Sequence, residues 1–239
     1  GVSAVFSFLL LLREFWKLSS YMETAFDGPA FREMAKVALP SILQQSTVSI
    51  GMLLVQSVVN SFGSERLAGF SAAMRVESLC IVPMAAMGNA MSSYTAQNLG
   101  AGRLDRVKKG YHVSILYAAF FAVVICTVLE IFHTSIIGLF LGGEGTRLAF
   151  ETGTGYLKFM GFFFIFIGLK MTADGLLRGA ADMTMFTVAN LANLGLRVLI
   201  AVTMAPVYGI QMVWFAVPVG WLVNFLISYG EYRSGKWKR

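Results

Sequence analysis

The stretch YHVSILYAAFFAVVICTVLEIF, at positions 111–132, contains one charged residue, Glu130. A helix needs about 20 consecutive, mostly apolar residues to cross the hydrocarbon core of a bilayer. This stretch meets that requirement, and an apolar run of this length is more typical of a membrane span than of a soluble helix. It therefore predicts a transmembrane helix.

Five further blocks of the chain share this length and apolar character, although several carry isolated polar residues. The complete set of predicted spans is 37–62, 67–99, 111–132, 156–177, 183–205 and 211–229. We therefore expect an all-α integral membrane protein, a polytopic helical bundle with six complete transmembrane helices. Residues 37–230 would form this six-helix lobe, and residues 231–239 a basic cytoplasmic tail.

The first twelve residues are apolar but too few to span a bilayer, and they lack the basic start of a signal peptide. We expect residues 1–12 to be the end of a truncated transmembrane helix. Residues 13–36 mix basic and acidic side chains with Gly28 and Pro29, and they predict a cytoplasmic connector.

The composition argues against a soluble domain. Hydrophobic residues make up 56% of the 239 positions and charged residues 13%, with a mean hydropathy of +0.68. Soluble domains are nearer a quarter charged. The net charge of +6 does not indicate nucleic-acid binding, because the basic residues lie in short connectors between apolar blocks.

Those basic residues alternate from one connector to the next. Connectors 13–36 and 100–110 and the C-terminus are rich in Lys and Arg, and connector 178–182 has Arg178, whereas the intervening connectors have few basic residues or none in excess of acidic ones. An excess of Lys and Arg in short loops marks the cytoplasmic side. We expect a multi-pass protein of the plasma membrane with a cytoplasmic C-terminus.

Two predicted spans carry polar side chains at helical spacing, so that each set falls on one face. The first set comprises Gln45, Ser49, Met52, Gln56 and Asn60, and the second comprises Thr187, Asn190, Asn193 and Arg197. Such faces line an internal cavity or hold helices together through hydrogen bonds. Pro83 and Pro218, inside two other spans, are candidate hinges or static kinks.

Charged residues inside spans are costly and are candidates for function. Arg75 and Glu77 are two positions apart and do not face each other, so each is expected to find a partner on another element. Arg75 could instead extend its side chain to the membrane interface. Lys170 and Asp174 are four apart on one face, which predicts a local ion pair, or a titratable, cation-binding Asp174.

No catalytic motif accompanies these residues, so we expect no enzyme. Cys80 and Cys126 have no CxxC spacing and predict neither a disulfide nor a metal site. His112 and His133 lie at opposite ends of one span, too far apart to share a metal. We expect no organic cofactor.

An ordered set of motifs along the chain resembles the C-terminal half of bacterial MATE (multidrug and toxic compound extrusion) transporters, of the MOP flippase superfamily. The motifs are LPSILQQ (39–45), VQSVVNSFG (55–63), AAMRVE (72–77), AQNLGAG (96–102) and LRGAAD (177–182). The resemblance implies the end of helix six and helices seven to twelve of a twelve-helix fold. A missing N-terminal six-helix lobe would then be a partner.

The resemblance also implies export of small organic cations or drugs by antiport with H⁺ or Na⁺. The ion-coupling candidates are Glu77 and Asp174, because the first full span has Gln44 and Gln45 but no acidic residue. The substrate-cavity candidates are Gln44, Gln45, Ser49, Met52, Gln56, Asn60, Arg75, Lys170, Asn190, Asn193 and Arg197.

Two alternatives remain open at this stage. A lipid-linked oligosaccharide flippase of the same superfamily would need a more cationic cavity to hold a pyrophosphate, which Arg75, Lys170 and Arg197 could supply. A non-transporting membrane scaffold is the other alternative, although two polar helix faces favour a cavity.

Overall fold

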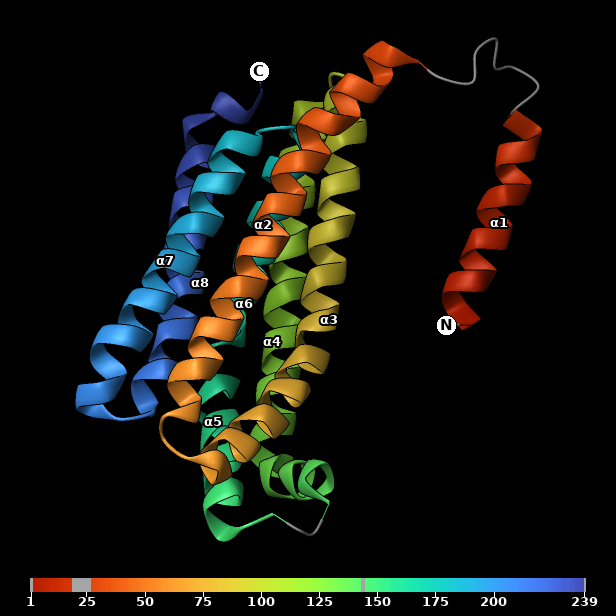
Figure 1. Ribbon diagram of the computed structural model, residues 1–239. Helices are drawn as coiled ribbons and strands as arrows, with labels where there is room; N and C mark the ends of the chain where they lie inside the picture. The colour runs from red at the N-terminus through yellow and green to blue at the C-terminus, as the bar shows by residue number, and fades with distance from the viewer. Residues whose placement is uncertain (1, 19–26, 143–144, 239) are drawn as a thin grey trace. The chain divides into compact units, whose positions relative to one another are not determined.

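The chain is all-α in the computed structural model, which describes residues 2–18, 27–142 and 145–238 and shows no strand among them. This confirms the predicted fold class. The helices, labelled in Figure 1, are α1 (Val2–Leu18), α2 (Gly28–Asn60), α3 (Ser64–Gly100), α4 (Leu104–Leu141), α5 (Arg147–Gly161), α6 (Phe164–Gly179), α7 (Met183–Tyr208), α8 (Gln211–Ser234) and a 3₁₀ turn, Lys236–Lys238.

The chain divides into two compact units, Gly1–Leu39 and Pro40–Arg239. In the first unit α1 extends to Leu18, beyond the predicted end at residue 12, because no glycine or proline interrupts the sequence there. Helix α2 begins at Gly28, with Pro29 in its first turn, where the missing N–H costs little. The prediction for residues 13–36 lies partly outside the described residues.

Four of the described helices, α3, α4, α7 and α8, are long and apolar enough to cross a membrane. The pair formed by α5 and α6 makes a fifth if it counts as one bent span. The predicted span 37–62 falls almost entirely within α2, which is not among these helices, so its role as a membrane span stays a prediction.

The predicted continuous span 156–177 is wrong in one respect. Helix α5 starts earlier, where Thr146 Oγ1 accepts a hydrogen bond from the Ala149 N–H, and it ends at Gly161. Helix α6 then continues at an angle of 58°. The backbone N–H groups of Phe163 and Phe166 bond three residues back, to Met160 and Phe163. No proline marks this break; Gly161, a weak helix former, is the only local signal.

The basic connectors lie at one end of the second unit. The connector between α3 and α4, the connector between α6 and α7, and the C-terminal residues lie together at that end, as Figure 1 shows. The α2–α3 and α7–α8 connectors, which carry few basic residues, lie at the other end. The alternation of charge in the sequence therefore follows the alternation of helix direction.

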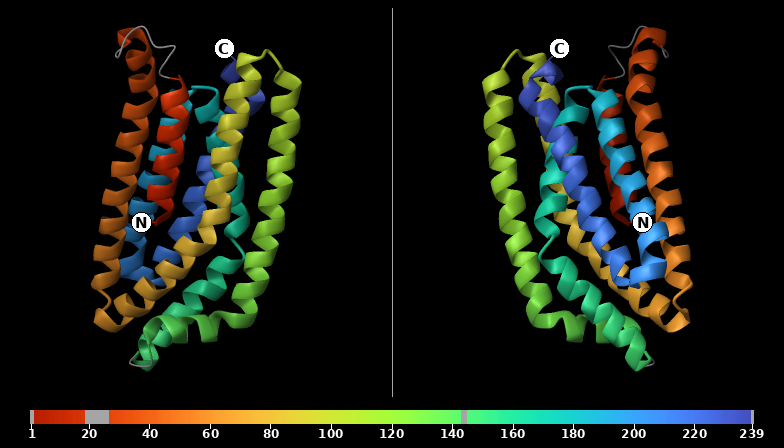
Figure 2. Two further views of the ribbon diagram at one scale, coloured as in Figure 1. Left: turned by 90° about the vertical axis from the view of Figure 1, so that its right-hand side faces the viewer. Right: turned by 90° about the vertical axis from the view of Figure 1, so that its left-hand side faces the viewer.

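Glycines let α3 approach its neighbours closely. A Cβ on Gly175 of α6 would lie 2.2 Å from the carbonyl oxygen of Gly88 in α3. A Cβ on Gly69 of α3 would lie 2.0 Å from the carbonyl oxygen of Ala149 in α5. Close packing through small residues is typical of membrane helices. Helix α4 also packs beside α3, and α8 beside α7, which Figure 2 shows from two sides.

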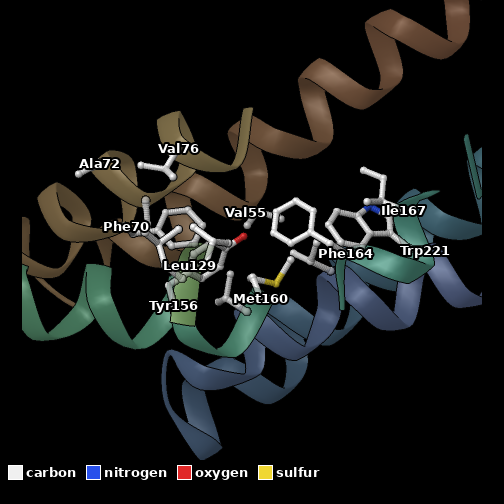
Figure 3. Close-up of a cluster of buried hydrophobic side chains, with 14 of the residues drawn as sticks. Val55, Phe70, Ala72, Val76, Leu129, Tyr156, Met160, Phe164, Ile167 and Trp221 are labelled. Carbon is white, nitrogen blue, oxygen red and sulfur yellow. The ribbon is translucent and has the colours of Figure 1, made fainter. Parts of the chain in front are cut away.

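The main apolar core lies between these helices. Figure 3 shows Phe70, Leu129, Tyr156, Phe164 and Trp221 gathered from α3, α4, α5, α6 and α8. Each is nearly inaccessible to solvent. The core fixes the helices from which the polar groups project.

Candidate functional site

A buried ion pair joins two neighbouring turns of α6. Lys170 Nζ donates a hydrogen bond to Asp174 Oδ2 at 2.7 Å, and the two residues are 6% and 5% exposed. The same ammonium group donates to Asn190 Oδ1 on α7 at 3.0 Å. The local ion pair predicted from the four-residue spacing is confirmed.

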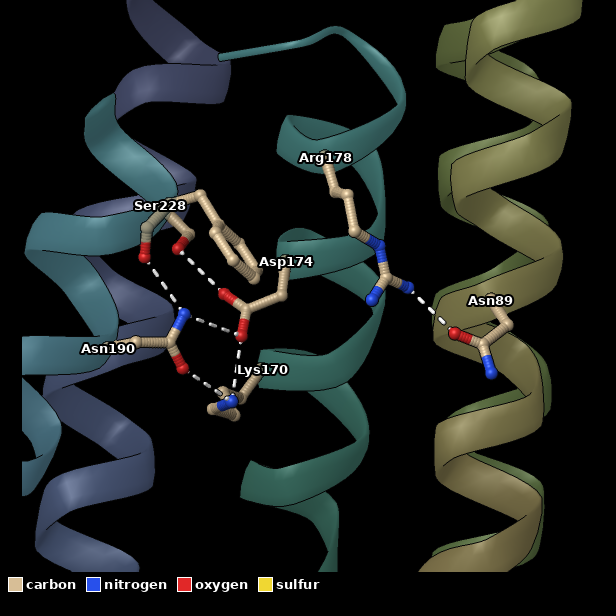
Figure 4. Close-up of polar contacts among 7 residues, drawn as sticks. Asn89, Lys170, Asp174, Arg178, Asn190 and Ser228 are labelled. Carbon is tan, nitrogen blue, oxygen red and sulfur yellow. Dashed lines mark hydrogen bonds and ion pairs between the residues drawn. The ribbon is translucent and has the colours of Figure 1, made fainter. Parts of the chain in front are cut away.

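Two further side chains complete the environment of Asp174, as Figure 4 shows. Asn190 Nδ2 donates to Asp174 Oδ2 at 3.3 Å, and Ser228 Oγ of α8 donates to Asp174 Oδ1 at 3.3 Å. Both carboxylate oxygens therefore have partners, drawn from three helices. We call Lys170, Asp174, Asn190 and Ser228 the Asp174 network. Sequence reasoning missed Ser228, because a single serine in an apolar span is no signal.

Another buried carboxylate, Glu77 of α3, has a neutral partner. The hydroxyl of Tyr156 on α5 donates to Glu77 Oε2, and both residues are buried. Arg197 of α7 also interacts electrostatically with Glu77, but no ion pair joins them. The expectation that Glu77 pairs with another element is confirmed, although the partner is a phenol that the sequence did not single out.

The expectation that Arg75 has a partner on another element is not met among the described residues. It is exposed on α3, and within the described part of the chain it has neither a hydrogen bond nor an ion pair. Glu77, two residues later, points to another side of the helix, as the helical spacing requires. Arg75 instead lines a cavity.

Two cavities in the second unit border these charged groups. The larger has a volume of about 380 Å³ and is lined by residues of α2, α3 and α7, among them Met52, Gln56, Arg75 and Arg197. The smaller, of about 140 Å³, is lined by Met52 and Arg197 again and also by Glu77, Lys170, Asn190 and Asn193. Because the linings share Met52 and Arg197, the cavities are neighbours.

Only part of the predicted polar face of α2 lines a cavity. Met52 and Gln56 line the larger cavity. Gln45, Ser49 and Asn60 are exposed and line neither cavity, and Ser49 Oγ donates to the carbonyl oxygen of Gln45 at 3.0 Å. The Gln44 side chain lies outside the described residues. Pro83 and Pro218 lie inside α3 and α8, and their role as hinges stays a prediction.

This arrangement defines a polytopic helical membrane protein with a buried ion pair and a buried carboxylate beside two cavities. Among the described residues, no group of three His, Cys, Asp or Glu side chains could hold a metal ion. The family model MatE matches residues 40–203, and the chain belongs to this family of integral membrane transporters. The resemblance read from the sequence motifs is thereby confirmed.

Individual relatives agree with this assignment. The chain is 30% identical over 214 residues to the probable multidrug resistance protein YpnP of Bacillus subtilis (strain 168), which covers 88% of this chain and 47% of that protein. The fold is similar to an outward-facing multidrug resistance MATE transporter of the MOP superfamily (TM-score 0.78, 20% identity, 90% of this chain and 49% of that one).

The fold is also similar to that of a MOP superfamily transporter from Pyrococcus furiosus, with a TM-score of 0.82 and 21% sequence identity. The match covers 90% of this chain and 49% of that one. The chain therefore spans about half the length of the relatives and structures that it matches.

Proposed function

We propose that this chain is one lobe of a secondary active transporter that exports amphipathic drugs, organic cations among them, by antiport with H⁺ or Na⁺. The observation that carries the proposal is the position of Glu77, a buried carboxylate at the wall of a cavity, with no ion pair in the described part of the chain. Intramembrane carboxylates of this kind are typical of ion pathways. The names of relatives such as YpnP support drug export.

The two coupling candidates, Glu77 and Asp174, differ in how readily they could bind an ion. The Lys170 ammonium already occupies one side of Asp174, at 2.7 Å. Glu77 has, within the part of the chain that the structure describes, only the Tyr156 hydroxyl as a direct partner. A proton can join Glu77 without breaking an ion pair, so the geometry favours Glu77 as the coupling group. We propose H⁺ as the coupling ion, because a carboxylate beside one hydroxyl can take up a proton without further oxygen ligands. Asp174 then holds α6, α7 and α8 together.

Binding of a proton can drive transport only if it favours one conformation over another. Arg197 lies on the wall of both cavities and interacts electrostatically with Glu77. When Glu77 is ionised, its charge offsets that of Arg197. When Glu77 is neutral, the guanidinium charge is unbalanced, and we expect α7 to favour a different position.

The part of its relatives that this chain does not cover suggests the rest of the transporter. A second, N-terminal six-helix lobe is the expected partner, with the substrate between the two lobes. The end of the second unit that carries the basic connectors would face the cytoplasm, with the protein in the plasma membrane.

The test is efflux of a fluorescent cationic dye from cells that express this chain alone or fused to an N-terminal MATE lobe. We expect export by the fused form only, and its arrest by an uncoupler. In the fused form, Glu77→Gln should abolish efflux. Asp174→Asn should lower the amount of folded protein more than the efflux per folded molecule.

A matched control is Glu65→Gln, which removes an exposed acidic residue near the start of the same helix. It should leave efflux unchanged. Full efflux by Glu77→Gln, or efflux that persists with the uncoupler, would contradict proton coupling at Glu77.

A second candidate is the flippase for a lipid-linked oligosaccharide, which would carry a pyrophosphate. The observation that favours it is the pair of arginines, Arg75 and Arg197, in the larger cavity. Lys170, the third cation expected for that function, is neutralised by Asp174. Translocation of a pyrophosphate-linked lipid without any dye export would favour the flippase.

A further inference from the structure

The larger cavity has an unbalanced positive charge. Arg75 of α3 and Arg197 of α7 both line it, and no acidic residue does. Within the described part of the chain, neither arginine has a hydrogen bond or an ion pair. Two buried acidic residues of the bundle have other direct partners: Asp174 binds Lys170, and Glu77 accepts a hydrogen bond from Tyr156.

Arg197 lies deep in the predicted membrane region. At about 1.5 Å per residue it is about 21 Å from the start of α7 at Met183 and about 17 Å from the end at Tyr208. If a hydrocarbon core about 30 Å thick is centred on α7, its nearer boundary lies about 13 Å from Arg197 along the helix. This distance is longer than an arginine side chain, so the guanidinium group does not reach the interface. An arginine at this depth is expected to face water or an anionic partner.

Glu77 offsets only part of this charge. It interacts electrostatically with Arg197 from the side of the smaller cavity, without an ion pair. Arg75 has no such neighbour on the wall of its cavity. An anion that enters the larger cavity therefore meets two guanidinium groups and no carboxylate.

The rest of the lining suits the body of an amphipathic molecule. Met52, Val55, Phe70 and Met74 supply apolar surface, and Gln56, Ser71 and Ser78 supply hydrogen-bonding groups. A volume of about 380 Å³ is within the usual range of small-molecule sites, about 300–1,000 Å³. A guanidinium group binds a carboxylate or a phosphate through two parallel hydrogen bonds.

We propose that Arg75 and Arg197 form an anion subsite that holds the carboxylate or phosphate group of an amphipathic substrate. The proposal rests on the transport function proposed above, and it narrows the substrate class. Among the molecules that the transporter carries, those with an acidic group gain binding at this subsite. A purely cationic molecule gains none here and would be held by other parts of the transporter.

Binding can be measured on the full chain in nanodiscs of uncharged phosphatidylcholine, through quenching of tryptophan fluorescence. The probes share one ring system: 2-naphthoate, 2-naphthyl phosphate, 2-naphthyl trimethylammonium and the uncharged 2-methoxynaphthalene. We expect at least one anionic probe to bind at least about 10-fold more tightly than both the cationic and the uncharged probe. The naphthoate and phosphate arms then show which acidic group is preferred.

The variants are Arg75→Gln and Arg197→Gln, each expected to weaken anion binding about 10-fold or more while leaving the uncharged probe unaffected. The control is Arg66→Gln, which removes an arginine of α3 that does not line the cavity. If a glutamine variant does not fold, Arg197→Lys keeps the charge and loses the planar pair of donors. It should then weaken binding by a smaller factor.

Equal or tighter binding of the trimethylammonium probe to the unmodified chain would overturn the proposal, and this comparison needs no variant. Unchanged anion binding in both glutamine variants would also overturn it. Failure of the proposed function looks different: the fused transporter would export no dye, although the anionic probes still bind and still depend on Arg75 and Arg197.

Discussion

Two of the buried carboxylates of the bundle, Asp174 and Glu77, have opposite surroundings. Asp174 has a cation, an amide and a hydroxyl from three helices, all within 3.3 Å. Among the described residues, Glu77 has one direct partner, the hydroxyl of Tyr156, and it lies on the wall of a cavity. A fully compensated carboxylate stabilises one arrangement of helices, whereas a carboxylate with a neutral partner can change its charge. The difference separates a structural role from a coupling role.

The largest expected effect comes from removing the cation of the Asp174 network. Lys170→Met would leave a buried carboxylate without its counter-charge and should lower the free energy of unfolding by about 3–5 kcal/mol. The measurement is unfolding of the purified chain by sodium dodecyl sulfate in mixed micelles, followed by circular dichroism.

The control is the double variant Lys170→Met with Asp174→Asn, which removes both charges. It should recover most of the lost stability, because no charge is then left unpaired. A double variant as unstable as Lys170→Met would show that the lysine stabilises the fold through packing and not through charge.

A smaller effect is expected from removing the partner of Glu77. Tyr156→Phe deletes one hydrogen bond to a carboxyl group and should cost about 1.5–3 kcal/mol in the same unfolding measurement. Tyr117→Phe is the control, because Tyr117 on α4 is 55% exposed. A cost equal to that of Lys170→Met would remove the distinction between the two carboxylates.

The smallest expected effect tests whether the two carboxylates depend on different helix contacts. Gly175→Ala places a Cβ 2.2 Å from the Gly88 carbonyl oxygen and should cost about 1–3 kcal/mol as α3 and α6 move apart. Gly195→Ala in α7 meets nothing within 4 Å and should stabilise by about 0.5–1 kcal/mol.

Combining Gly175→Ala with the other variants sharpens the comparison, because residues in contact give non-additive effects. The loss of unfolding free energy caused by Gly175→Ala should not add to that caused by Lys170→Met, since Gly175 adjoins Asp174 in the sequence. It should add to the loss caused by Tyr156→Phe. Additivity in both combinations would mean that the α3–α6 contact does not position the Asp174 network.

Local features of this structure could be predicted from the sequence. The Lys170–Asp174 pair follows from helical spacing alone, and the apolar blocks give the approximate bounds of α3, α4, α7 and α8. Contacts between distant segments could not be predicted. Tyr156 is 79 residues from Glu77, and Ser228 is 54 residues from Asp174. Which of many tyrosines and serines meets a carboxylate depends on how the helices pack.

The break between α5 and α6 could not be predicted from the sequence either, because no proline lies at or near it. Arg75 shows a different limit. Its spacing correctly excluded Glu77 as a partner, but it could not show that the side chain faces a cavity, because that depends on α2 and α7.

The gathering of basic connectors at one end of the second unit has a consequence for how the protein is made. The 100–110 segment and the C-terminus each carry several basic residues, whereas the α6–α7 segment carries Arg178 alone. The first two segments would each independently be retained on the cytoplasmic side as the ribosome delivers the helices to the membrane. Neutralising Arg178 alone would then leave the orientation of the protein in the membrane unchanged. Orientation would be encoded redundantly, and mutations could accumulate in any one connector without inverting the newly synthesised chain.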